Sequence, residues 1–224
     1  MIINSHVDLQ SRSVLLCASF PSGERGKVVI PYDVNAIADA VTAMTRAILA
    51  ANGRIAFGGH PTITPLILLI ASNRNERQLV DVYQSEWFDN EITPETRRLE
   101  SLGYGKIHWT KRGESLGSSL TTLRKVMLKE SNPLGAIFVG GMDGLFEEYG
   151  LFHREYPERP CIPVRGPGGA ASRLDPVGVP GELAQRLTSL RYPFLSHAVV
   201  DFLGQQLDKQ YRKRRQYGKN EGLH

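Results

Sequence analysis

The stretch that decides the fold runs from Gly135 to Tyr149 and reads GAIFVGGMDGLFEEY. Its short apolar run predicts a buried strand, and the glycine cluster that follows predicts a tight turn into a helix. Such glycines permit positive φ and close approach of the backbone, and the helix start behind them favours an anion. Glu147 and Glu148 lie one turn inside this helix, so the stretch offers what a site for a phosphorylated, ribose-bearing molecule requires. Taken alone, it is equally typical of an ordinary strand-to-helix turn with solvated glutamates.

Length and composition bound the class of protein. The chain has 224 residues, 41% hydrophobic and 22% charged, which is typical of one globular α/β domain, with two small domains as the alternative. Cys17 and Cys161 lie in apolar runs and are expected to be buried thiols, as in a reducing compartment. We find no signal peptide in the first residues and no apolar run near the roughly 20 residues of a membrane span. We therefore expect a cytoplasmic protein with no membrane partner.

Part of the net charge of +4 is concentrated in a basic run from Lys209 to Arg215. Such a run can contact nucleic acid or acidic lipid, but a solvated helix end is the more common case. Nothing that resembles a nucleic-acid module accompanies it, so we expect no nucleic-acid partner. DNA binding stays open only as a third alternative, with the tail as its local support.

Predicted strands and helices alternate along the whole chain. Strands are expected at residues 13–20, 54–57, 79–83, 106–110, 135–139 and 160–164, and helices at 33–53, 65–71, 94–102, 115–130, from the glycine turn to about 156, and 194–211. This alternation predicts a single α/β domain, with a mostly parallel sheet and helices on both faces.

Four loops with small residues leave the predicted strands, at residues 19–26, 58–64, 140–144 and 165–171. Parallel α/β sheets bind ligands beyond the carboxyl ends of their strands, near the point where the strand order reverses. We expect the four loops to gather there around a nucleotide-sized pocket. His60 could contact the ligand, although a loop histidine is more often structural or exposed.

Four motifs occur in a fixed order: Ala18-Ser19-Phe20-Pro21, Gly58-Gly59-His60-Pro61-x-x-Thr64, Gly140-Gly141-x-x-Gly144-x-x-Glu147-Glu148-Tyr149 and Gly166-Pro167-Gly168-Gly169-Ala170. In this order they resemble the SLOG superfamily of Rossmann-like domains, which is related to the "lonely guy" phosphoribohydrolases, the DprA protein and the ligand-binding domains of TRPM channels. The resemblance spans about residues 13 to 205 and implies a Rossmann-like fold that binds a nucleotide-derived ligand.

The enzyme branch of that superfamily carries an Arg-Lys-x-x-Met segment and a Pro-Gly-Gly-x-Gly-Thr-x-x-Glu turn. Here Arg124-Lys125-Val126-Met127 lies upstream of the glycine turn at closely similar spacing. By resemblance, Arg124 and Glu148 would be the catalytic pair of a nucleoside 5′-monophosphate phosphoribohydrolase or a related N-glycosidase. A carboxylate stabilises the positive charge that builds on the ribose when the N-glycosidic bond breaks, and the arginine would hold a phosphate or the leaving base.

The turn departs from the enzyme pattern where phosphate would be held. Val139 replaces the proline, Leu145 replaces the threonine, and one extra residue, Met142 or Asp143, widens the turn. The lost hydroxyl and the added carboxylate argue for a different ligand or for binding without turnover. The departures bring the chain closer to SLOG domains of prokaryotic conflict systems, a likeness that implies a sensor of ADP-ribose-type or cyclic-nucleotide signals. We favour the sensor over the hydrolase.

These arguments define three regions: an N-terminal extension at 1–12, a SLOG-like nucleotide-binding domain at 13–208 and a basic tail at 209–224. We expect no cofactor and no metal, and by resemblance a homo-oligomer. The predicted ligand-binding residues, in chain order, are Ser19, Phe20, Pro21, Arg25, Gly58, Gly59, His60, Thr64, Gly140, Gly141, Met142, Asp143, Gly144, Glu147, Gly168 and Gly169.

Overall fold

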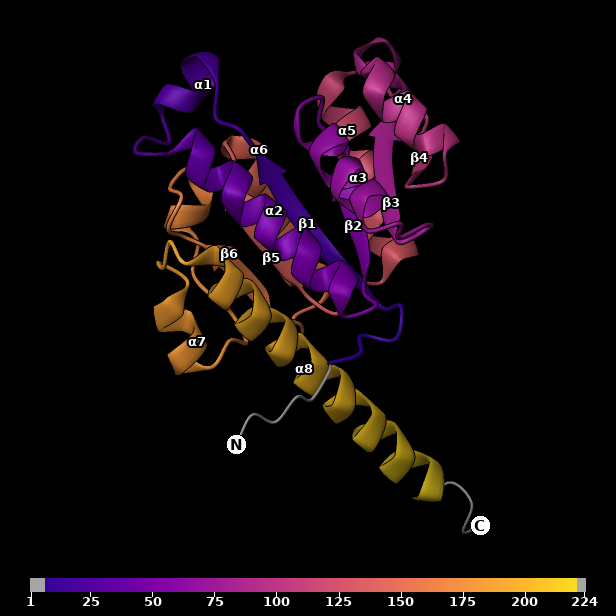
Figure 1. Ribbon diagram of the computed structural model, residues 1–224, viewed down its shortest axis with the longest axis vertical. Helices are drawn as coiled ribbons and strands as arrows, with labels where there is room; N and C mark the ends of the chain where they lie inside the picture. Colours follow the sequence, from indigo (N-terminus) through magenta and orange to yellow (C-terminus); the bar gives the residue numbers. More distant parts are fainter. Residues whose placement is uncertain (1–6, 221–224) are drawn as a thin grey trace.

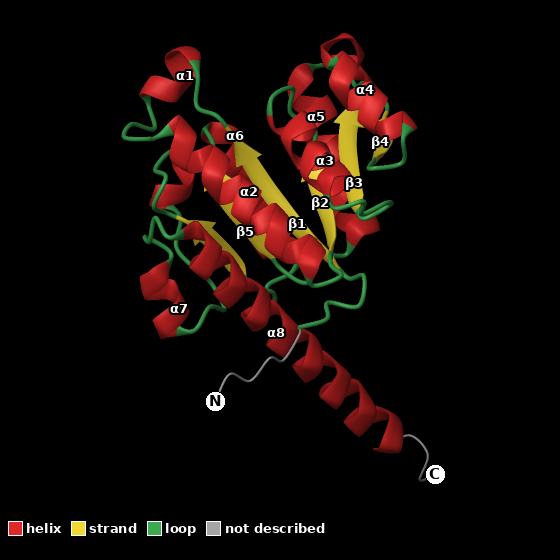
Figure 2. Ribbon diagram, in the orientation of Figure 1, coloured by secondary structure: helices red, strands yellow, loops and turns green. Residues whose placement is uncertain are grey.

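The protein folds around one sheet of six parallel strands in the order β4-β3-β2-β1-β5-β6. A computed structural model describes residues 7–220, with the side chains of residues 7–211. The strands are β1 (Ser13–Ser19), β2 (Arg54–Gly58), β3 (Val80–Ser85), β4 (Lys106–Thr110), β5 (Ala136–Gly140) and β6 (Cys161–Val164). Their arrowheads in Figure 2 point to the end of the molecule where α1 lies. This is the predicted parallel α/β architecture, and it is Rossmann-like.

Helices connect successive strands and cover both faces of the sheet. They are α1 (Gly23–Lys27), α2 (Val34–Ala50), α3 (Ile63–Asn73), η1 (Glu86–Glu91), α4 (Pro94–Ser101), α5 (Leu116–Ser131), α6 (Asp143–Glu155), η2 (Ala170–Arg173), α7 (Gly181–Arg186) and α8 (Tyr192–Asn220). Figure 1 shows α2 and α8 side by side across one face of the sheet, with the last turns of α8 projecting past the sheet.

Successive side chains of each strand point to opposite faces of the sheet, and this explains why the protein has one hydrophobic core on each face. In β1, Val14 and Leu16 pack with residues of α2, α3 and α8, while Leu15 and Cys17 pack with residues of α5 and α6. Because successive side chains of a strand point to opposite faces, a continuous apolar run buries both faces of a central strand. Both cysteines are buried free thiols, as predicted.

Polar caps fix where the helices begin. The Asp33 carboxylate accepts hydrogen bonds from the backbone N–H groups of Asn35 and Ala36 at the start of α2. Ser115 and Ser118 form a reciprocal capping box at the start of α5. These caps satisfy N–H groups that have no partner within the helix.

The structure corrects several predicted bounds. The last helix runs from Tyr192 to Asn220, beyond the predicted 194–211, and it continues without a break through the proposed boundary at residue 209. The short elements α1, η1, η2 and α7 were not predicted from the sequence. Parts of the proposed extension (1–6) and tail (221–224), and the side chains of residues 212–215 in the basic run, lie outside the described residues. The division into three regions therefore stays a prediction.

The strand order places the expected binding edge. The chain moves outward from β1 to β4 on one side and then returns to β5 and β6 on the other, so the order reverses between β1 and β5. A crevice forms at such a reversal, beyond the carboxyl ends of the strands. Among residues 7–220, no helix is both long and apolar enough to cross a membrane.

Candidate functional site

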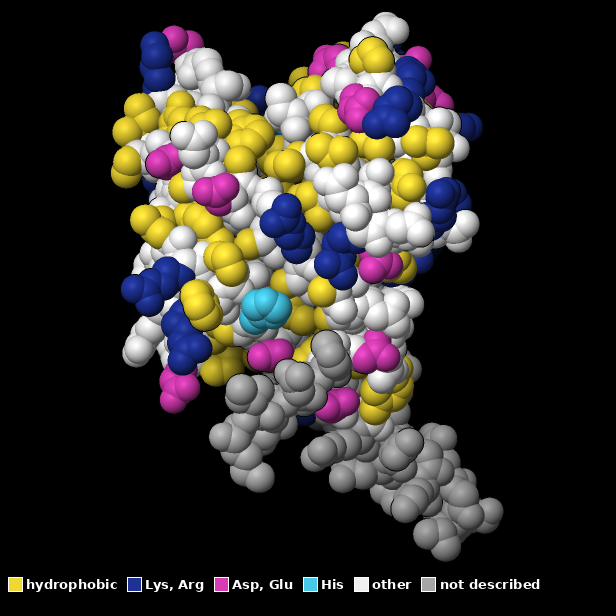
Figure 3. Space-filling model, viewed as in Figure 1, with side chains coloured by type: hydrophobic (Ala, Val, Ile, Leu, Met, Phe, Trp, Pro, Cys, Tyr) yellow, Lys and Arg dark blue, Asp and Glu magenta, His cyan; other side chains and the backbone are white. Residues whose placement is uncertain are grey.

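A cavity of about 350 Å³ lies at the carboxyl ends of β1, β2 and β3, between the loops that follow them and helices α5 and α6. Figure 3 shows a notch at this end of the molecule, between the α1 side and the α4 side. The volume lies at the small end of the range for small-molecule sites. The lining residues are Leu16, Cys17, Ala18, Ser19, Arg25, Gly58, Gly59, His60, Pro61, Gln84, Phe88, Glu91, Leu120, Leu123, Arg124, Met142, Gly144, Leu145 and Glu148.

The loop after β1 is joined to the glycine turn after β5. The backbone N–H of Gly141 donates to Ser19 O at 2.8 Å, which extends the β1–β5 ladder into the turn. Arg25 Nε donates to Asp143 Oδ1 at 3.0 Å across the rim. This hydrogen bond lowers the pKa of Asp143 below its usual range. The charges of both side chains are therefore paired with each other at the start of α6.

The loop after β2 forms the opposite wall. Gly59 N–H donates to Tyr83 O at 2.8 Å, and His60 N–H donates to Thr64 Oγ1 at 2.8 Å, which fixes the turn into α3. His60 Nδ1 lies 3.0 Å from Thr62 Oγ1. Burial lowers the pKa of His60, so its ring is neutral at pH 7. If His60 contacts the ligand as predicted, its neutral ring would form a hydrogen bond and not an ion pair.

Arg124 of α5 links the two helices that close the cavity. Its Nη1 pairs with the Glu147 carboxylate, its Nε lies 3.4 Å from Glu148 Oε1, and its Nη2 donates to Gly144 O at 3.3 Å. The Arg124 side chain is 9% exposed and that of Glu148 is 23% exposed. The two residues that the SLOG resemblance implied as a catalytic pair are therefore in contact and line the same cavity.

Burial is the main influence on the acid groups of the cavity floor. It raises the pKa of Glu148, and the nearby Arg124 guanidinium offsets only part of the rise. Burial also raises the pKa of the Cys17 thiol well above its usual value, with the Glu148 carboxylate adding to the effect. Cys17 is therefore a protonated thiol at neutral pH and a poor nucleophile.

Two helices begin at the cavity without side-chain caps. The residues before them, Thr62 for α3 and Met142 for α6, accept no hydrogen bond from the first backbone N–H groups of their helices through their side chains. Each start leaves N–H groups with no intrahelical partner and a positive dipole end, which favour an acceptor such as a phosphate oxygen.

The third glycine loop lies elsewhere. Gly169 N–H donates to Pro31 O at 3.0 Å, and Ala170 N–H donates to Gly141 O at 3.0 Å. A Cβ on Gly168 would collide with Pro31 O, and one on Gly169 would lie 2.8 Å from the backbone of Gly140. Gly168 and Gly169 thus permit close packing of three backbone segments and do not line the cavity.

The structure brings together about half of the residues predicted from the sequence. Those on the lining are Ser19, Arg25, Gly58, Gly59, His60, Arg124, Met142, Gly144 and Glu148. Asp143 and Glu147 do not line the cavity, but each forms an ion pair with an arginine that does, Arg25 and Arg124 respectively. Those outside the lining are Phe20, Pro21, Thr64, Gly140, Gly141, Gly168 and Gly169.

Sequence reasoning missed three side chains on the β3 side of the cavity, Gln84, Phe88 and Glu91. Gln84 lies at the end of β3, and Phe88 and Glu91 follow it in η1. Neither element carries a glycine motif, so no local signal marked these residues. Among residues 7–211, no cluster of three or more His, Cys, Asp or Glu side chains could hold a metal ion.

A larger cavity, of about 710 Å³, opens at the amino ends of the strands below the end of α5. Its central carboxylate, Asp81, already accepts a hydrogen bond from Arg54 at 2.7 Å and pairs with His108 at 2.8 Å. This carboxylate is thus already paired within the protein, and the helices that follow the strands begin at the other edge of the sheet. We therefore place the candidate site at the carboxyl-end cavity.

The fold and this cavity define a Rossmann-like α/β protein whose candidate site lies at the strand-order reversal. The model of the SLOG cluster3 family matches residues 30–199, more than half of the chain, so the protein belongs to this family. The resemblance inferred from the loop motifs is confirmed. A solved X-ray structure, that of the Northeast Structural Genomics Consortium target TM1055, aligns over 73% of this chain and 80% of that chain, at 16% identity and a TM-score of 0.49. A comparison with curated proteins found no match.

Proposed function

We propose that the protein is a sensor module that binds a nucleotide-derived ligand, of the ADP-ribose or cyclic-nucleotide type, in the carboxyl-end cavity. The observation that carries the proposal is the convergence of the loops after β1 and β2 with the glycine turn before α6 on one cavity of about 350 Å³. Loops 58–64 and 140–148 come from different thirds of the chain, and both contribute to its wall.

The charges around the cavity favour a ligand of low charge density. The two lining cations, Arg25 and Arg124, are already paired with Asp143 and Glu147. A phosphate monoester carries close to two negative charges at pH 7, whereas each phosphate of a diester or a pyrophosphate bridge carries about one. Binding a monoester would place a near-dianion beside these carboxylates. The paired charges around the cavity thus favour a ligand with esterified phosphates, whose oxygens would accept hydrogen bonds from backbone N–H groups.

The second candidate function is hydrolysis of an N-glycosidic bond, supported by the contact between Arg124 and Glu148. The raised pKa of Glu148 suits a group that exchanges a proton with a leaving base or with water. However, the guanidinium is shared among Glu147, Glu148 and Gly144 O, which leaves it little capacity for a substrate phosphate. We therefore rank the hydrolase second.

Binding and turnover separate in one set of measurements. ADP-ribose, 3′,5′-cyclic AMP, AMP and NAD are each added to the protein, followed by thermal-shift measurement and chromatography of the mixture. A bound ligand at about 100 times its dissociation constant adds about 2.7 kcal/mol to the free energy of unfolding. We expect a shift with ADP-ribose or cyclic AMP and no released base. Release of base that is lost in Glu148→Gln would establish the hydrolase instead.

Gly58 offers a variant that blocks the cavity. A Cβ at this position meets only Leu123, at 3.9 Å, so the backbone has room for the Cβ of Gly58→Val, and the valine side chain lies at the cavity wall. We expect it to fold and to lose binding. Gly150→Ala in α6, where an added Cβ meets nothing within 4 Å, is the matched control and retains binding. Equal ligand affinity in both variants would place the site elsewhere.

A further inference from the structure

Gln84, at the end of β3, is a largely buried residue whose side chain lines the cavity. The residue is 4% exposed and lines the carboxyl-end cavity. Its backbone carbonyl accepts a hydrogen bond from Thr110, but its side-chain amide makes none with the residues that the structure describes. Among the described side chains, the buried polar atoms without a partner are Thr45 Oγ1 and Tyr192 OH, so the amide atoms of Gln84 keep access to the space of the cavity and can hydrogen-bond a molecule that fills it.

The backbone of Gly59 positions this amide. A Cβ on Gly59 would lie 3.0 Å from Gln84 Cδ and Nε2 and 3.2 Å from its Oε1. The amide therefore lies flat against the glycine, and any larger residue at position 59 would displace it. The carbonyl and the NH₂ group of the amide stay available as one acceptor and one donor side by side.

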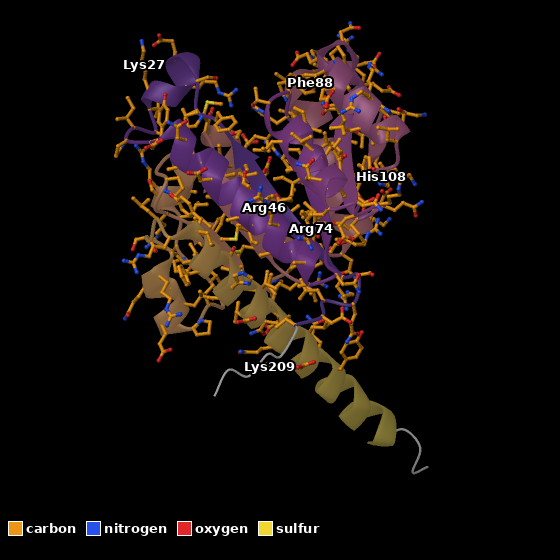
Figure 4. The ribbon with its side chains drawn as sticks, viewed as in Figure 1. Lys27, Arg46, Arg74, Phe88, His108 and Lys209 are labelled. Carbon is orange, nitrogen blue, oxygen red and sulfur yellow. The ribbon has the colours of Figure 1, made fainter. Side chains whose placement is uncertain are left out.

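Phe88, in η1, supplies an aromatic surface on the same side of the cavity. Its side chain is half-buried and lines the cavity, and it belongs to neither hydrophobic core cluster. Figure 4 places it at the same end of the molecule as Lys27 of α1, opposite Lys209 of α8. An aromatic ring outside the core at a cavity wall is suited to stacking on a flat ligand group.

We propose that Gln84 and Phe88 form an adenine subsite, in which the ring of Phe88 stacks on the base and the amide of Gln84 pairs with its N6 and N7 edge. This inference rests on the proposed function and specifies the base of its ligand. A glutamine amide matches adenine because its oxygen accepts from the N6 amino group while its NH₂ donates to N7. Hypoxanthine carries a carbonyl oxygen in place of the amino group, so the same amide meets acceptor against acceptor. Aromatic stacking accepts either base.

The test compares adenine and hypoxanthine forms of the same ligands. Isothermal titration calorimetry measures binding of ADP-ribose and cyclic AMP, and of their inosine counterparts, to the wild-type protein and to Phe88→Ala, Phe88→Tyr and Gln84→Met. Base–aromatic stacking is worth about 1–3 kcal/mol, so Phe88→Ala is expected to weaken binding by about 5- to 150-fold, while Phe88→Tyr retains it. The wild type is expected to prefer the adenine form by at least tenfold, and Gln84→Met to bind both forms equally.

Two failures are distinguishable. If the wild type binds ADP-ribose or cyclic AMP as tightly as the inosine forms, and Phe88→Ala retains full affinity, the subsite is overturned while the proposed function stands. If the wild type binds none of the four probes, the proposed function fails and the subsite with it. Thermal unfolding of each variant checks folding, and Phe88→Ala keeps the test decisive if Gln84→Met does not fold, because Phe88 lies outside both cores.

Discussion

The substitution Glu148→Gln tests the electrostatics of the cavity floor. Burial raises the pKa of Glu148 in the folded protein, with Arg124 offsetting part of the rise. Between the unfolded and the folded pKa, the folded state holds a proton that the unfolded state has released. The free energy of unfolding therefore falls as pH rises, by up to about 1.4 kcal/mol for each pH unit in that window. Glutamine has the shape of the protonated acid and does not ionise. The free energy of unfolding of the variant therefore does not fall with pH on account of this residue.

At pH 7 we expect Glu148→Gln to be more stable than the wild type. Each unit by which the pKa is raised corresponds to about 1.4 kcal/mol, or about 3–6 °C in Tm for a chain of this size. The introduced amide still accepts from Arg124 Nε, and the guanidinium keeps its pairing with Glu147 and its bond to Gly144 O. Loss of the ion pair between Arg124 and Glu148 is therefore not expected to make the variant less stable than the wild type.

Urea unfolding from pH 4.5 to pH 8, followed by tryptophan fluorescence, measures this effect. Glu147→Gln is the matched control, because it removes the neighbouring carboxylate, whose side chain is 67% exposed. Only the Glu147 side of this ion pair faces solvent, but Arg124 keeps Glu148 and the Gly144 carbonyl as acceptors, so this control is expected to lose no more than about 1 kcal/mol and to keep the fall of stability with rising pH. A Glu148→Gln variant that is less stable than the wild type at pH 7, with a parallel pH profile, would refute the reasoning.

Three further substitutions test other parts of the account. Gly169→Ala puts a Cβ 2.8 Å from the backbone of Gly140, at a φ of +72° that alanine rarely adopts. Urea unfolding should show that the free energy of unfolding falls by about 2–4 kcal/mol. The control Gly181→Ala, whose Cβ meets nothing within 4 Å, should lower it by no more than about 1 kcal/mol. Asp33→Ala removes the cap of α2 and should lower the free energy of unfolding by about 1 kcal/mol; an unchanged urea midpoint would contradict this. Asp143→Asn releases Arg25 from its ion pair, so calorimetry should show several-fold tighter binding of ADP-ribose, and weaker binding would contradict the charge argument.

The architecture was predictable because hydrophobic pattern and turn chemistry agree along the chain. Continuous apolar runs mark strands that are buried on both faces, and β4 occupies the predicted residues Lys106–Thr110. Short polar segments carry no such pattern. The sequence Glu86–Glu91 forms η1 through local hydrogen bonds, including one from Trp87 N–H to the Ser85 hydroxyl, and no periodicity marks it.

The site was only partly predictable because glycine serves two purposes. Gly58 and Gly59 line the cavity, whereas Gly168 and Gly169 allow backbone segments to pack together. Both roles require glycine, so the sequence alone does not distinguish a cavity-lining glycine from one that permits close packing. Gln84 was missed for a different reason, since its role depends on a neighbouring strand that ends in glycine.

Amide hydrogen exchange with and without ADP-ribose tests most directly whether the carboxyl-end cavity is the binding site. We predict slower exchange together in residues 19–26, 58–64 and 140–148 when the ligand is bound, and no such change in the Gly58→Val variant. Binding that leaves these three segments unchanged, or that slows exchange only along α2 and α8, would contradict it.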